Sequence, residues 1–148
     1  MKISSKARSS ITAMVELVKR MEFVRYIPLS YLAEKDGLSL VLLEQLFSKL
    51  RKSGLVMSHR GLSGGYALTR SPQDISIYDI IQSVDPITDA MLCKGNVEGC
   101  KLTGTECSTH HLWYSFDVLT QSFFKSVTLY DVVYNKGVLE RHEKGGIS

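Results

Sequence analysis

The hydrophobic positions in the first third of the chain predict three helices in succession. Over residues 5–21, apolar side chains recur at alternating steps of four and three, the spacing of one helix face. A short second helix over residues 28–35 opens with a proline, which suits a first turn. After a turn that contains a glycine, Ser39 is a favourable N-cap for a third helix that ends at about Lys52. Two short helices joined by such a turn predict a helix-turn-helix.

Two runs of β-prone residues, 55–60 and 66–70, flank the glycine-rich segment 61–65 and predict a hairpin. Directly behind a helix-turn-helix, this hairpin would be the wing of a winged helix. Residues 76–79 have the pattern of a capping box, which opens a short helix that ends at about Val84. The wing therefore lies between the helix-turn-helix and a fourth helix.

A longer helix is predicted over residues 108–126, with Ser108 or Thr109 as its N-cap, and a short helix that opens at Thr128 follows it. Apolar residues cover more of the long helix than one side of a small domain needs, which indicates burial on two sides. We therefore expect this helix to form the interface of a homodimer. Its apolar positions are Leu112, Trp113, Phe116, Val118, Leu119, Phe123 and Phe124.

These elements predict a mainly α fold with a small β-hairpin wing: a winged helix-turn-helix plus a long C-terminal dimerisation helix. We expect a DNA-binding domain in residues 1–85 and a cysteine-bearing loop in residues 86–107. The dimerisation helix and a short terminal helix would occupy residues 108–135, and residues 136–148 would form a flexible tail. No apolar run approaches the roughly 20 residues that span a bilayer. We therefore expect a cytoplasmic protein without a membrane segment.

Charge is distributed unevenly along the chain, although the net charge is only +3. Residues 1–70 contain 12 Lys or Arg and 5 Asp or Glu, a net charge of +7, whereas residues 71–148 have a net charge of −4. A basic half of this kind suits a polyanion such as DNA, because counterion release contributes to the affinity. Ordinary solvated surface charge is the alternative explanation.

The third predicted helix has one apolar and one polar face. Its apolar face, which should be buried, consists of Leu43, Leu46, Phe47 and Leu50. The polar face suits a major groove, because a glutamine amide can bond adenine, a glutamate can accept from cytosine, and lysines can bind phosphate. An ordinary solvated helix face would have the same composition. The candidate DNA-binding residues on this helix and the wing are Ser39, Val41, Glu44, Gln45, Ser48, Lys49, Lys52, Arg60, Gly61 and Ser63.

All three cysteines lie in one short loop, and a histidine follows the last of them. The pattern is C-x6-C-x6-C-x2-H, formed by Cys93, Cys100, Cys107 and His110. An odd number of cysteines in a cytosolic protein argues against disulfides. Inert buried thiols, thiol redox switching, a structural zinc site and an iron–sulfur cluster are the possible explanations. The wide spacing fits a cluster better than zinc, whose sites usually include a short Cys-x2–4-Cys pair.

Three stretches of the sequence closely resemble the IscR family of winged-helix iron–sulfur regulators. They are Leu-Glu-Gln-Leu-Phe at 43–47, Leu-Arg-Lys-x-Gly-Leu-Val at 50–56 and Arg-Gly-x-x-Gly-Gly-Tyr at 60–66. The family includes the nitric-oxide sensor NsrR and the cysteine-metabolism regulator CymR, and the similarity extends to about Val133. The chain departs from the family in two places. Its cysteine gaps are six rather than about five, and Val41-Leu42 replaces the usual Ser-Tyr.

The resemblance also implies a ligand set and a cluster type. His110 and His111 share a helix face with Cys107, so spacing alone does not choose between them. By the resemblance, His110 is the ligand because it precedes x-Leu-Trp, and it holds a [2Fe–2S] cluster together with the three cysteines. NsrR-like relatives hold [4Fe–4S] with the same cysteines, usually without that histidine. We therefore favour [2Fe–2S] over [4Fe–4S].

The expected protein is a homodimeric transcription regulator that binds a pseudo-palindromic operator in double-stranded DNA. The resemblance implies that its cluster, supplied by the cell's assembly machinery, reports iron–sulfur status and that cluster-assembly genes are among its targets. Two alternatives use the same scaffold: a [4Fe–4S] nitric-oxide-sensing repressor, and a zinc-stabilised DNA-binding protein without a sensing role. An enzyme is not expected, because the sequence has no nucleophile–base motif and no phosphate-binding loop.

Overall fold

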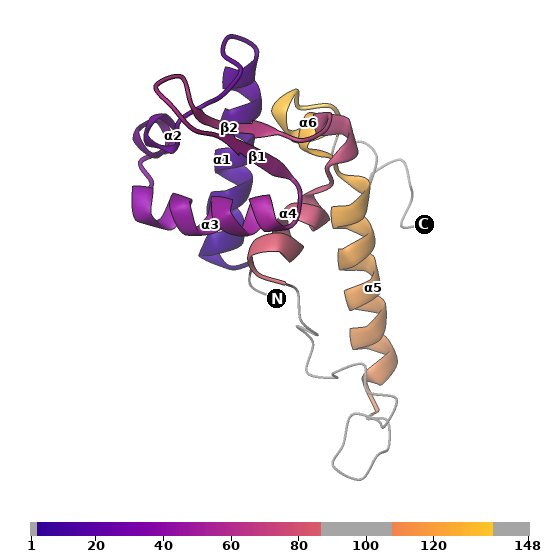
Figure 1. Cartoon of the computed structure of the whole chain (residues 1–148). Helices are drawn as coiled ribbons and strands as arrows, with labels where there is room; N and C mark the ends of the chain where they lie inside the picture. Colours follow the sequence, from indigo (N-terminus) through magenta and orange to yellow (C-terminus); the bar gives the residue numbers. More distant parts are fainter. Residues whose placement is uncertain (1–2, 87–107, 138–148) are drawn as a thin grey trace.

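The computed structural model describes residues 3–86 and 108–137 (Figure 1). The three cysteines and the residues after Gly137 lie outside these ranges. The described part contains the predicted helices and hairpin, together with a short 3₁₀ helix that was not predicted. The elements are α1 (Ser5–Met21), α2 (Leu29–Asp36), α3 (Leu40–Lys52), β1 (Val56–His59), β2 (Gly65–Leu68), the 3₁₀ helix η1 (Pro72–Asp74), α4 (Ile77–Val84), α5 (His110–Ser126) and α6 (Leu129–Val133).

Local side-chain chemistry sets the ends of the helix-turn-helix. Ser39 is the N-cap of α3 as predicted, and its hydroxyl accepts a hydrogen bond from the Leu42 backbone N–H at 3.3 Å. Pro28 differs from the prediction, because it occupies the N-cap of α2 with an extended ψ of 143° rather than lying in the first turn. Between the two helices, Gly37 has a φ of +64°, a left-handed conformation that costs a glycine little.

A single β-bridge joins the wing to the segment just before α2. β1 and β2 pair antiparallel, beginning with Val56 opposite Leu68. On the other edge of β2, Tyr66 and Ile27 exchange backbone N–H···O bonds of 2.8 and 2.9 Å. A Cβ atom at Gly65 would clash with the backbone of Ile27, so a glycine is needed for this approach. The sequence patterns did not predict this bridge.

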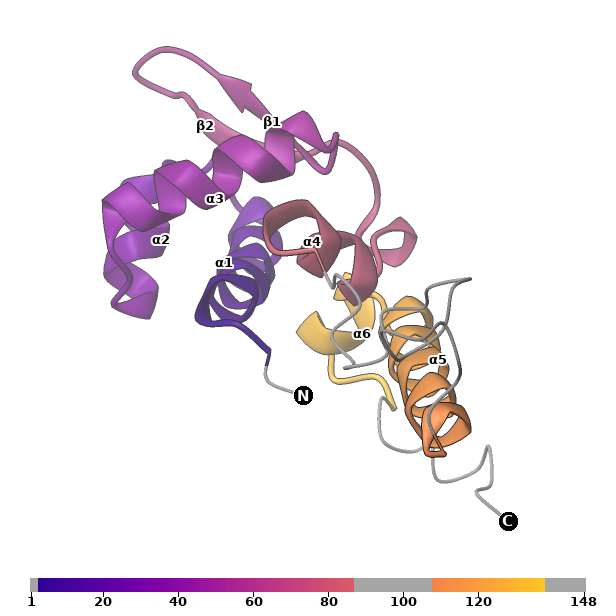
Figure 2. The same ribbon diagram turned by 90° about the horizontal axis from the view of Figure 1, so that it is seen from below.

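α1, α3 and α4 share one apolar core (Figures 1 and 2). α4 begins with the predicted capping box of Ser76 and Asp79, whose two hydrogen bonds are both 3.0 Å. It packs against α1 and α3 and, at its other side, against α5. The fully buried side chains of the core include Met14, Leu17, Leu32, Phe47 and Ile80.

α5 extends away from this core (Figure 1). None of its residues is buried. Its C-terminal end is anchored by two backbone hydrogen bonds. The Ile77 N–H donates to the Val127 carbonyl at 2.9 Å, and the Leu129 N–H donates to the Ile75 carbonyl at 2.8 Å. α6 begins with a capping box of Thr128 and Asp131, and it packs against α1. α5 is therefore held at one end only within the described residues.

Replacing Phe47 with alanine tests the assignment of the α3 faces. Phe47 is fully buried, and its ring meets that of Tyr66 edge-on with 5.1 Å between centroids. We expect Phe47→Ala to lower the free energy of unfolding by about 3–5 kcal/mol, because it removes buried apolar surface and leaves a cavity. Val41→Ala, on the exposed side of the same helix, should change it by less than about 0.5 kcal/mol. Urea unfolding followed by circular dichroism measures both, and equal effects would contradict the assignment.

Candidate nucleic-acid interface

The polar side of α3 lines an open hollow of about 490 Å³. This side is turned to solvent because the opposite side of the helix is packed in the core, where Leu43, Leu46, Phe47 and Leu50 are at most 1% exposed. Val41 is 63% exposed, and Ser48 is half-buried at the centre of the helix. Six of the predicted DNA-binding residues line this hollow and are named the α3 face: Val41, Glu44, Gln45, Ser48, Lys49 and Lys52.

The remaining predicted DNA-binding residues lie at the start of α3 and in the wing loop. Arg60, Gly61 and Ser63 are all exposed, and Gly61 has a φ of +121° that favours glycine. Ser39 is exposed too, although its hydroxyl is already the acceptor of the helix cap. In both views α3 and the wing lie on the side of the molecule away from α5 (Figures 1 and 2).

Two hydrogen bonds hold the wing to the end of α3. The Arg51 guanidinium donates to the Ser58 hydroxyl of β1 at 3.3 Å. The Thr69 hydroxyl donates to the Gly54 carbonyl at 2.6 Å, between the segment after β2 and the turn after α3. Sequence analysis missed both contacts, because they join residues whose pairing depends on where the hairpin folds back.

Lys49 has a second contact that the sequence did not predict. Its ammonium donates to the backbone carbonyl of Val84, the last residue of α4, at 3.3 Å. The same side chain lines the hollow on the α3 face. Lys49 therefore belongs both to the candidate nucleic-acid surface and to the end of α4.

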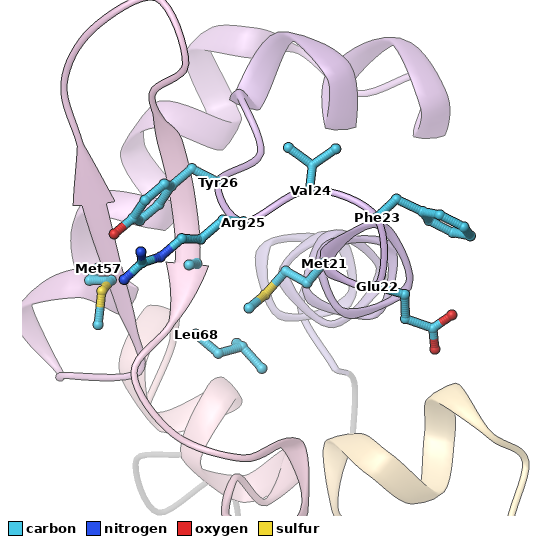
Figure 3. Close-up of a pocket in the computed structure, with 9 residues that line it drawn as sticks. Met21, Glu22, Phe23, Val24, Arg25, Tyr26, Met57 and Leu68 are labelled. Carbon is cyan, nitrogen blue, oxygen red and sulfur yellow. The ribbon is translucent and has the colours of Figure 1, made fainter.

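A second hollow, of about 420 Å³, lies behind the wing (Figure 3). Because side chains alternate along a strand, Met57 faces this hollow whereas Ser58 faces α3. Nearby, the ring of Tyr26 stacks on His59 at 4.8 Å, and the Arg25 guanidinium lies 5.3 Å from the Tyr26 ring. None of the residues that line this hollow belongs to the α3 face.

His110 is the one member of the predicted metal site that the described residues include. It is the first residue of α5, is half-buried, and stacks on Tyr114 with 6.2 Å between ring centroids. His111 beside it is exposed. Thr109 occupies the predicted N-cap, but it makes no capping bond, and its hydroxyl instead accepts from the Trp113 ring N–H at 3.1 Å. Cys93, Cys100 and Cys107 lie outside the described residues.

The apolar side chains of α5 are largely exposed. Leu112 and Leu119 are 61% and 60% exposed, and Phe116 is 41% exposed. Phe123 and Phe124, near the anchored end, are the ones packed against the core. A contiguous apolar stripe of this kind is typical of an interaction surface.

A comparison with known protein families matches residues 3–135 to Rrf2, described as an iron-dependent transcriptional regulator. The chain belongs to the Rrf2 family. Among its relatives, the HTH-type transcriptional regulator IscR of Pectobacterium carotovorum is 41% identical over 140 residues, which are 95% of this chain and 84% of the relative. IscR of Yersinia enterocolitica matches at the same identity and coverage.

Solved structures of Rrf2-type regulators resemble this chain as well. CymR, the global cysteine regulator of B. subtilis, superposes with a TM-score of 0.76 at 34% identity, covering 92% of this chain and 98% of CymR. IscR of T. potens superposes with a TM-score of 0.71 at 30% identity, covering 100% of this chain and 93% of that protein. These matches confirm the predicted winged-helix fold class.

Family membership also confirms the predicted general function. The relatives are named as HTH-type transcriptional regulators, so this Rrf2 protein is a DNA-binding transcription regulator and not an enzyme. The resemblance to IscR that the sequence motifs indicated is confirmed. Within the two described ranges, no helix has the length and apolar character needed to cross a membrane.

Proposed function

We propose that this Rrf2 protein is a homodimeric regulator whose operator binding depends on an iron–sulfur cluster and which senses the cell's iron–sulfur status. The observation that carries the proposal is the placement of the α3 face and the wing loop on one side of the molecule, with the helix that starts at His110 on the other. Its proposed targets include cluster-assembly genes, and its cluster donor is the cell's assembly machinery. The protein then acts in the cytoplasm, where its operators are.

In the proposed complex, α3 enters the major groove of a pseudo-palindromic operator and the wing contacts the adjacent backbone. We propose that Gln45 bonds adenine and that Glu44 accepts from the cytosine amino group. Lys49 and Lys52 supply phosphate contacts, which carry affinity rather than sequence preference. The remaining proposed contacts are Ser39, Val41, Ser48, Arg60, Gly61 and Ser63.

The exposed stripe of α5 supports the proposed homodimer. A single chain leaves Leu112, Phe116 and Leu119 facing solvent, although burying each apolar side chain would be favourable. Pairing with the same stripe of a second copy would bury all three in a two-fold interface. Two copies of the α3 face would then be presented to the two halves of a pseudo-palindrome.

We propose that Cys93, Cys100, Cys107 and His110 hold the cluster. Three thiolates and one imidazole are ligands that iron–sulfur clusters accept, and the donor set therefore fits. [2Fe–2S] is favoured over [4Fe–4S] because the family resemblance includes the histidine. These four side chains would hold the cluster, which would supply a redox-active iron centre. The chain's own contribution is the placement of His110, which the first turn of α5 sets.

Alanine substitutions on the α3 face separate base contacts from phosphate contacts. We expect Lys52→Ala to weaken binding to all duplexes similarly and to reduce the slope of log affinity against log salt by about one. Gln45→Ala should cost about 1–3 kcal/mol at particular base pairs and relax the preference there. Fluorescence anisotropy with an operator selected from random duplexes, and with its single-base variants, measures both. Lys125→Ala on α5 is the control, and indistinguishable losses for Gln45 and Lys52 would refute the assignment.

A charge in the apolar stripe tests the dimer. Leu119→Asp would place a carboxylate in the proposed interface, where burying it unpaired is costly. We expect this variant to sediment as a monomer while keeping its helical circular dichroism, because no residue of α5 is buried within one chain. Gln121→Glu, which adds a charge on the opposite side of the same helix, is the control. A monomeric wild-type protein would contradict the proposal.

The two adjacent histidines provide a matched test of the cluster site. Anaerobically purified wild-type protein should be coloured and contain iron and sulfide. His110→Ala should lower the iron and sulfide content and alter the visible spectrum, whereas His111→Ala should leave both close to wild type, because only His110 is a proposed ligand. Replacing any of the three cysteines with alanine should bleach the protein without unfolding the winged helix. A colourless protein with one zinc per chain, or a reversed effect of the two histidines, would overturn the assignment.

A further inference from the structure

We propose that Lys49 bridges operator DNA to the end of α4 and thereby couples the α3 face to the segment that leads into the cysteine loop. This inference rests on the proposed function and names how that site is regulated. The observation behind it is the dual position of one side chain. The Lys49 ammonium donates to the Val84 carbonyl at 3.3 Å while the side chain lines the hollow on the α3 face.

The Lys49–Val84 contact provides a hydrogen-bond donor for a carbonyl at the C-terminal end of α4. The last carbonyl groups of a helix lack partners within the helix and carry partial negative charge. The last turn of α4 contains no basic residue of its own, so Lys49 of α3 supplies the positive charge there. An ammonium group has three donors, so a bond to Val84 leaves donors for a phosphate oxygen. We therefore expect Lys49 to keep its bond to Val84 when it binds a phosphate.

Because of the position of α4 in the fold, this contact can link the α3 face to the proposed cluster site. Ile80, Ile81 and Val84 are buried, and α4 packs against α1, α3 and α5. Asp85 and Pro86, the residues directly after α4, lead into the segment that carries the proposed cysteine ligands. In this proposal, a restraint on that segment reaches Lys49 through the end of α4 and the Val84 carbonyl.

Lys52 provides an internal comparison. It lines the same hollow one helical turn from Lys49, and it makes no hydrogen bond to α4 within the described part of the chain. Both lysines would bind phosphate, but only Lys49 would link that binding to α4. By thermodynamic linkage, DNA that stabilises the Lys49 bridge must also stabilise the end of α4, and the reverse.

The first test uses the full-length dimer without its cluster. The Asp85 N–H donates to the Ile81 carbonyl at 2.9 Å, so its hydrogen exchange reports opening of the end of α4. In wild-type protein, a saturating operator duplex should slow this exchange. Lys49→Met should speed it about two- to fivefold in the free protein and abolish the slowing by DNA. Lys52→Met should behave as wild type at saturation. If DNA does not slow the exchange in wild-type protein, or slows it equally in Lys49→Met, the inference is wrong.

The second test compares operator affinity with and without the cluster. The ratio of the two dissociation constants should move toward one in Lys49→Met, because the link to α4 is lost. In Lys52→Met both constants should rise and their ratio should stay at the wild-type value. An unchanged ratio in Lys49→Met would overturn the inference. If the operator affinity of the wild-type protein is the same with and without the cluster, the proposed sensing function is wrong. The hydrogen-exchange experiment would still decide the role of Lys49.

Discussion

Burial of one side of α3 is the constraint on which the orientation of the whole DNA-binding half depends. Successive residues of a helix turn by 100°, so placing Leu43, Phe47 and Leu50 in the core directs the α3 face outward. The same packing extends into the hairpin, because the Phe47 ring meets Tyr66 of β2. A single apolar contact surface therefore positions both the helix and the wing.

Several short-range contacts hold the wing against α3 and the segment before α2. The backbone bridge between Ile27 and Tyr66 requires a glycine at position 65, because a side chain there would clash with Ile27. The Arg51–Ser58 hydrogen bond joins α3 to β1 directly. Contacts that are formed before DNA binds reduce the ordering cost at binding. The wing and α3 therefore form one continuous surface before DNA binds.

α4 occupies the position from which the two halves of the protein can influence each other. It shares the core with α1 and α3, and it is also the element on which α5 rests. A ligand can change DNA affinity only by favouring one of two arrangements of the protein. The end of α4 is well suited to such a role, because its last carbonyl is held by Lys49 of α3 rather than by α4 itself.

The sequence by itself determined the elements, the buried face of α3 and the family, because helix periodicity, caps such as Ser39 and glycine-rich turns act locally. It also indicated the extra apolar surface of α5. Only the tertiary structure showed the Ile27–Tyr66 bridge and the Lys49–Val84 contact, which join residues 39 and 35 positions apart. Such contacts depend on how whole elements pack in three dimensions, and no local pattern of side chains encodes that geometry.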